Sequence, residues 1–214
     1  MTTMRICFVG DSLTNGTGDA AFLGWPGRLC RREVQAGNDI TCYNLGIRAE
    51  TTEMIRARWR AECEPRLPEV FPGALVFAFG TNDTAVEDGA PRVAFDRTLE
   101  NARSMIAEAM DWKPTLWIGP PPIDESRQPF QAGPGAPVRD FQNARIAEMS
   151  DAFAETAAEM GVPYLDLFTP LSADSDWAQS FAVGDGVHPP DNGYAIIAER
   201  VAGWDYWRSW FPGA

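Results

Sequence analysis

Residues 5–16 of the chain read RICFVGDSLTNG. Four apolar residues at 6–9 lead directly into Gly10, Asp11 and Ser12, so the segment predicts a buried strand that ends in a turn. Four more short apolar runs occur along the chain, and longer segments of helical periodicity lie between them. This alternation is typical of parallel strands that are connected through crossover helices.

We expect five strands, at residues 5–9, 40–44, 74–79, 115–118 and 162–165. We expect five main helices, at residues 25–36, 51–62, 91–112, 138–160 and 192–203. Pro91 is suited to a first helical turn, and Gly161 is suited to a helix end. The predicted fold class is therefore α/β, an open three-layer sandwich with a five-stranded parallel sheet. Ligands of such folds bind beyond the carboxyl ends of the strands.

The length of 214 residues favours one domain, residues 1–214, because neither a repeat nor an interdomain linker is visible. The longest apolar run, residues 74–79, is far shorter than the roughly 20 residues that a membrane span needs. The first residues lack the apolar stretch of a secretory signal peptide. We therefore expect a cytoplasmic protein without membrane attachment.

The charge balance argues against polyanionic partners. Thirty acidic residues against 18 basic ones give a net charge of −12. Nucleic acids and anionic lipids require clustered cations, which a surface this acidic does not favour. A small molecule is the expected partner.

Polar residues follow the predicted strands at the same edge of the sheet. Ser12 ends the first strand, Gly46 follows the second, and Asn82 follows the third. The only histidine, His188, comes three residues after Asp185 in a loop rich in glycine and proline. A hydroxyl, an imidazole, a carboxylate and uncharged N–H donors are the groups that acyl transfer needs. Each residue taken alone also fits an ordinary turn, a helix cap or a packed side chain.

Together these segments resemble the blocks of the GDSL, or SGNH, hydrolase family. The blocks are Gly10-Asp11-Ser12-Leu13, Gly46, Gly80-Thr81-Asn82-Asp83 and Asp185 with His188, in family order. The resemblance implies a flavodoxin-like α/β/α sandwich and a serine esterase that needs neither a metal nor an organic cofactor. It implies that Ser12, Asp185 and His188 are catalytic. It also implies that Ser12, Gly46 and Asn82 form the oxyanion hole. One departure is Ala49, where the family often carries a second glycine three residues after the first.

The leading functional prediction is hydrolysis of short-chain carboxylic esters, with acetyl groups on a small alcohol or carbohydrate favoured. A thioesterase or lysophospholipase would use the same catalytic residues, and a non-catalytic carbohydrate-binding protein is the remaining alternative. The proline-rich loop at residues 120–137 is expected to wall the pocket. Candidate substrate contacts are Arg48, Trp177 and Phe181. Arg48 could bind a substrate carboxylate, although pairing with Glu50 or with another acid in solvent is the favoured alternative. The two aromatic residues could equally be core residues.

The C-terminal tail, residues 204–211, holds five aromatic residues among eight. Aromatic side chains at this density are costly to leave in water. The tail is therefore expected either to cover the core of its own domain or to form a contact in a homo-oligomer, and stacking on a sugar is a third, less favoured alternative.

Overall fold

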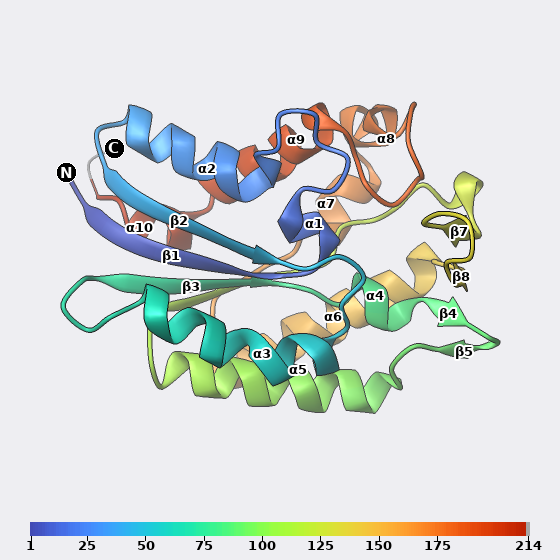
Figure 1. The fold of residues 1–214 in the computed structure, drawn as a ribbon, viewed down its shortest axis with the longest axis horizontal. Helices are drawn as coiled ribbons and strands as arrows, with labels where there is room; N and C mark the ends of the chain where they lie inside the picture. The colour runs from blue at the N-terminus through green and yellow to red at the C-terminus, as the bar shows by residue number, and fades with distance from the viewer. Residues whose placement is uncertain (213–214) are drawn as a thin grey trace.

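The computed structural model describes residues 1–212, and its centre is a parallel five-stranded sheet (Figure 1). The strand order is β2-β1-β3-β6-β9. Counted within this sheet the order is 2-1-3-4-5, which is the flavodoxin-like order. The strands are β1 (Thr3–Gly10), β2 (Asp39–Gly46), β3 (Gly73–Ala78), β6 (Thr115–Ile118) and β9 (Tyr164–Leu165).

Helices cover both faces of the sheet, so the predicted three-layer α/β/α class is confirmed. One layer consists of α2 (Gly24–Gln35), α9 (Asp191–Ala202) and α10 (Asp205–Ser209). The other consists of α3 (Thr52–Cys63), α5 (Phe95–Met110) and α6 (Asn143–Met160). Figure 1 shows these two layers above and below the strands. Short helices lie in the connections, namely α1 (Ser12–Asn15), α4 (Thr81–Thr84), α7 (Phe168–Ser172), α8 (Ser175–Ser180), η1 (Glu64–Arg66) and η2 (Glu125–Arg127).

The central strands read as continuous apolar runs because both of their faces are buried. In β1, Ile6 and Phe8 pack into the core beneath α2 and α9. Cys7 and Val9 point the other way and pack into the core beneath α3, α5 and α6. This two-sided burial fixes β1 in the middle of the fold and fixes the position of the turn that follows it.

Two predicted helix starts are wrong. The third helix begins at Phe95 rather than at residue 91, because Pro91 belongs to a hairpin of β4 (Val86–Glu87) and β5 (Ala90–Pro91). Its two-residue loop is Asp88-Gly89, and both residues have positive φ, as the tight turn of a hairpin requires. An Asp-Gly pair is a recognised hairpin signal, so this element could have been predicted.

The fourth helix begins at Asn143 rather than at residue 138. Val138 lies in a second hairpin, formed by β7 (Phe130–Gln131) and β8 (Val138–Arg139). This hairpin is joined to the first by a β-bridge between Val86 and Asp140. The proline-rich loop is therefore tied to the neighbouring connection, and both lie at one end of the sheet (Figure 1).

The aromatic tail covers the core of its own chain. Trp207 and Phe211 are almost completely buried, and the ring of Trp207 lies 6.3 Å from that of Phe8 in β1. Trp207 Nε1 also donates a hydrogen bond to the buried carboxylate of Glu33. Within residues 1–212, every helix is too short or too polar to cross a membrane.

Candidate active site

The loops after β1, β2 and β3 and the loop before α9 meet beyond the carboxyl ends of the strands (Figure 1). In a doubly wound sheet, the place where the strand order reverses is the usual ligand site. Here the reversal lies between β1 and β3. Ser12 follows the first of these strands, and Asn82 follows the second.

Ser12 is held at the start of a short helix. Asp11 is the N-cap of α1, and its carboxylate accepts a hydrogen bond of 2.9 Å from the backbone N–H of Leu13. The N–H of Ser12 itself lies in the first turn, where no intrahelical acceptor exists. Within residues 1–212 the N–H of Ser12 donates no backbone hydrogen bond and remains available at the end of β1.

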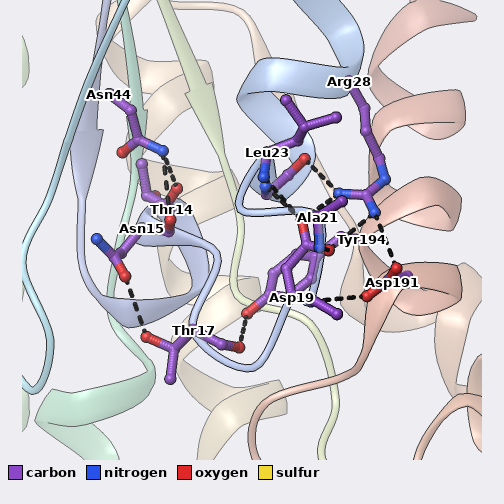
Figure 2. A network of polar contacts seen from close by, with 12 residues as sticks. Thr14, Asn15, Thr17, Asp19, Ala21, Leu23, Arg28, Asn44, Asp191 and Tyr194 are labelled. Atoms are coloured by element: carbon purple, nitrogen blue, oxygen red, sulfur yellow. Dashed lines mark hydrogen bonds and ion pairs between the residues drawn. The ribbon is translucent and has the colours of Figure 1, made fainter.

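A polar network anchors the segment that follows Ser12 (Figure 2). Asn44 donates to the carbonyl of Thr14 at 2.8 Å, and Tyr194 donates to the carbonyl of Thr17 at 2.7 Å. The buried carboxylate of Asp19 accepts from three backbone N–H groups and is paired with Arg28. Burial alone would raise the pKa of Asp19, but the hydrogen bonds from Arg28 and from the backbone outweigh it and hold that pKa well below its usual range.

His188 connects Ser12 to Asp185. The Nε2 atom of His188 lies 2.8 Å from the Ser12 hydroxyl oxygen, and its Nδ1 atom lies 2.7 Å from Oδ2 of Asp185. The other carboxylate oxygen, Oδ1, accepts hydrogen bonds from the backbone N–H groups of Val187 and His188. Burial would raise the pKa of Asp185, but its bond and charge interaction with His188 and these two N–H groups lower it overall. A negative charge on Asp185 is thus stabilised beside the imidazole.

Asn82 lies in α4, immediately after β3, and its amide nitrogen Nδ2 donates to Oδ2 of Asp11 at 3.3 Å. An amide nitrogen carries two hydrogens, so one remains for another acceptor. Asp11 is buried, and burial raises its pKa to about 6 against the lowering effects of the Leu13 N–H and of His188.

Asp83, next to Asn82, faces away from this cleft and anchors α3. Its carboxylate accepts from the backbone N–H and the hydroxyl of Thr52 and from the hydroxyl of Thr98. Burial raises the pKa of Asp83 to about 6 in spite of these bonds.

The structure does not support Gly46 as an oxyanion donor. Its N–H donates to the side-chain carbonyl of Asn44 at 3.0 Å, and Gly46 is absent from the lining of the cleft. Glycine is needed there for another reason, because a Cβ at this position would lie 2.2 Å from the backbone nitrogen of Asn15.

Ala49 offers a backbone N–H where Gly46 does not. Ala49 lines the cleft, has the left-handed φ of +66°, and its N–H makes no hydrogen bond to any residue within 1–212. A non-glycine residue in this conformation is strained, and such strain gathers at functional sites. The sequence signal for this position is the alanine itself. The family often carries glycine here, and glycine is the residue that a position with positive φ favours.

The cleft beside Ser12 is small, with a volume of about 50 Å³. Phe130 and Ala132 of the proline-rich loop line it, together with Phe141 and Val187. Arg48 also lines the cleft. The predicted alternative, in which Arg48 pairs with Glu50 or another acid, is not found within residues 1–212: Glu50 is bound by Arg58 at 2.6 Å, and Arg48 forms no ion pair.

Trp177 and Phe181 do not line this cleft. Both are buried in the core beneath α9, with their rings 5.2 Å apart in an edge-to-face arrangement. The indole N–H of Trp177 donates to the carbonyl of Pro122. Trp177 thereby holds the start of the proline-rich loop. The residues lining the cleft that the sequence did not point to include Arg139, Phe141 and Val187.

Comparisons with known proteins agree with the fold and with the sequence blocks. The model of the GDSL-like lipase/acylhydrolase family matches residues 8–196. The chain is 27% identical over 195 residues to the isoamyl acetate-hydrolyzing esterase 1 homolog of Mus musculus, covering 86% of this chain and 74% of that protein. It is 26% identical over 208 residues to the Homo sapiens protein of the same name, covering 92% and 79%. Among solved structures, the lipase/acylhydrolase from Enterococcus faecalis superposes with a TM-score of 0.76 at 25% identity, covering 97% of each chain.

Proposed function

Since the chain belongs to the GDSL-like lipase/acylhydrolase family and is an ester hydrolase, we propose that it cleaves short-chain carboxylic esters through an acyl-enzyme on Ser12. The observation that carries the proposal is the continuous hydrogen-bonded chain from Ser12 through His188 to Asp185, with contacts of 2.8 and 2.7 Å. A serine, a general base and a group that orients the base are the parts of a catalytic triad.

The reaction begins when the Ser12 hydroxyl attacks the ester carbonyl carbon. His188 Nε2 takes the hydroxyl proton, and Asp185 holds the Nδ1–H and stabilises the imidazolium. The tetrahedral intermediate collapses, the C–O bond to the alcohol breaks, and the alcohol leaves with the proton from His188. Water then attacks the acyl-enzyme with His188 again as base, which releases the carboxylic acid and restores Ser12.

The negative oxygen of the tetrahedral intermediate needs preorganised donors. We assign this role to the backbone N–H groups of Ser12 and Ala49 and to the amide of Asn82, all of which line one cleft. Donors of this kind contribute about 2.7–4 kcal/mol each to lowering the barrier. Ala49 replaces Gly46 in this assignment, because the N–H of Gly46 is already bonded to Asn44.

The size of the cleft supports a short acyl group. A volume of about 50 Å³ corresponds to roughly three to five water-sized sites at about 10–15 Å³ each. An acetyl or propionyl group fits such a space, whereas a long acyl chain would extend past Phe130 and Phe141 into solvent. The mouse and human relatives are named for hydrolysis of isoamyl acetate, which is an acetyl ester.

The test has two parts. A fluorophosphonate probe should label the purified protein at Ser12, and Ser12→Ala should abolish the labelling. A series of 4-nitrophenyl esters from acetyl to dodecanoyl should show the highest kcat/KM at two to four carbons. Absence of labelling would favour a non-catalytic binding protein, and a maximum at eight carbons or more would favour a thioesterase or lysophospholipase.

A further inference from the structure

Two arginine side chains line the cleft that holds Ser12 and His188, although the protein as a whole is strongly acidic. These are Arg48, from the loop after β2, and Arg139, from the β7–β8 hairpin. The catalytic chemistry proposed above uses neither of them. The two arginines therefore need a function other than catalysis to explain their position at the cleft.

Arg48 has an exposed side chain, and within residues 1–212 it forms neither an ion pair nor a hydrogen bond. The nearest acid in sequence, Glu50, is engaged by Arg58, which also binds Glu62. Arg48 lies next to Ala49, which lines the same cleft. Its guanidinium can therefore contact a bound substrate without giving up a bond within the protein.

Arg139 has a side chain that is only 13% exposed. Its Nε donates to Glu87 at 2.7 Å, while its two terminal nitrogens make no hydrogen bond within the described part of the chain. A guanidinium held through Nε alone has its terminal N–H groups available for an acceptor. The aromatic residues Phe130 and Phe141 line the same cleft and limit its contact with water.

The carboxylate of Glu87 is shared with a second arginine, so it does not fully neutralise Arg139. Its Oε2 atom also lies 3.6 Å from Nε of Arg92, whose Nη1 atom is buried without a partner within residues 1–212. Burial and the neighbouring charge of Arg139 lower the pKa of Arg92. Two guanidinium groups beside one carboxylate leave an excess of positive charge at this side of the cleft.

The acidic residues of the site form no ion pair with Arg48 or Arg139 within residues 1–212. Asp185 accepts hydrogen bonds from His188 and from two backbone N–H groups, and Asp11 accepts from Leu13 and Asn82. Because long-range attraction between exposed charges is screened beyond about 8–10 Å, the local arginines matter more to a bound ligand than the net charge of the whole protein.

We propose that the ester substrate carries a carboxylate, which Arg48 and Arg139 bind while Ser12 attacks the ester carbonyl. This inference rests on the proposed function and adds the charge of the substrate to it. Guanidinium groups recognise carboxylates through paired, charge-assisted hydrogen bonds. The carboxylate can belong either to the acyl part or to the alcohol part, and the experiment separates these two sources.

The experiment compares two matched pairs of esters, each made of a free carboxylate and its uncharged methyl ester. For the acyl part, mono-4-nitrophenyl succinate is compared with methyl 4-nitrophenyl succinate. For the alcohol part, 4-acetoxybenzoate is compared with methyl 4-acetoxybenzoate. We expect the charged member of one pair to be hydrolysed at least about tenfold more efficiently in kcat/KM, since one charge-assisted hydrogen bond is worth roughly a factor of ten or more. Raising the salt concentration should reduce this preference.

Substitutions of the two arginines then test which side chain causes the preference for the charged ester. Arg48→Gln should reduce the ratio of charged to neutral kcat/KM about tenfold, mainly through KM, and Arg48→Lys should restore part of it. Arg139→Gln should reduce the ratio as well. Arg31→Gln, which removes an exposed cation from α2, is the matched control and should leave the ratio unchanged. Arg48 is exposed, so its replacement leaves folding intact even where Arg139→Gln does not.

The inference is overturned when the wild type shows no preference for either charged ester, or when its preference survives in both Arg48→Gln and Arg139→Gln. If the neutral esters are still hydrolysed in that case, the proposed function, hydrolysis of short-chain esters, is not affected. If neither charged nor neutral esters are hydrolysed and Ser12 is not labelled by a fluorophosphonate, the proposed function itself fails.

Discussion

Replacing Asp185 with asparagine should disable the triad without changing its shape. In the structure, Oδ1 of Asp185 accepts from the N–H groups of Val187 and His188, at 2.9 and 2.8 Å, and only Oδ2 faces the imidazole. An asparagine at this position keeps both backbone bonds only if its carbonyl oxygen takes the place of Oδ1. Its NH2 group must then face Nδ1 of His188.

This orientation forces the wrong tautomer. An NH2 group can only donate, so Nδ1 must become an acceptor and the proton moves to Nε2. A protonated Nε2 cannot take the proton of Ser12. In a serine protease the corresponding Asp→Asn substitution lowers kcat about 10⁴-fold, and we expect a loss of roughly 10³- to 10⁴-fold here.

The assay is hydrolysis of 4-nitrophenyl acetate at saturating substrate, with thermal unfolding measured alongside to show that Asp185→Asn remains folded. Asp185→Ala is the companion variant, because it removes the orienting group without imposing a tautomer. Asp185→Asn should be no more active than Asp185→Ala. Retention of more than a tenth of the wild-type kcat by Asp185→Asn would refute the reasoning.

Three other predictions concern Asn82, the Ser12–His188 pair and Asp83. Asn82→Ala should lower kcat about 100-fold or more in the same assay, because it removes one oxyanion donor; a loss below tenfold would speak against that role. Ser12→Ala and His188→Ala should each remove nearly all turnover, and the double variant should lose little more, because the two residues act as one unit; multiplicative losses would show independent roles. Burial raises the pKa of Asp83 from 3.8 to about 6, so the stability that its protonated form contributes is fully present below pH 3.8 and is lost as the pH rises through 6. The measurement is urea unfolding of the wild type and of Asp83→Asn between pH 4 and 7. Over this range the free energy of unfolding of the wild type should fall by about 2–3 kcal/mol relative to that of the variant. A difference that stays constant with pH would contradict the assignment.

Much of the fold could be predicted because the strong signals are local. Buried parallel strands read as apolar runs, and Ser12, Asn82 and His188 follow strands or sit in a loop whose position the sheet dictates. The Asp88-Gly89 pair is also a local signal. It indicates a hairpin that includes Pro91, and for this reason α5 begins at Phe95 and not at Pro91.

The sequence alone did not decide which backbone N–H group on the loop after β2 is free of a hydrogen bond. Whether the N–H of Gly46 is free depends on the side chain of Asn44, which bends back and binds it. The free N–H belongs to Ala49, in a conformation that the sequence disfavours. Likewise, nothing local shows that Trp177 and Phe181 pack inward beneath the proline-rich loop rather than facing the cleft.

The contact between Ser12 and His188 joins residues that are 176 positions apart. One partner stands at the end of the first strand, and the other comes just before α9, which packs against α2 on the same face of the sheet. Neither the amino-terminal half of the chain nor the carboxyl-terminal half carries a working site of its own. In the mechanism proposed above, Ser12 therefore meets its general base only in a chain in which both α2 and α9 are folded against the sheet.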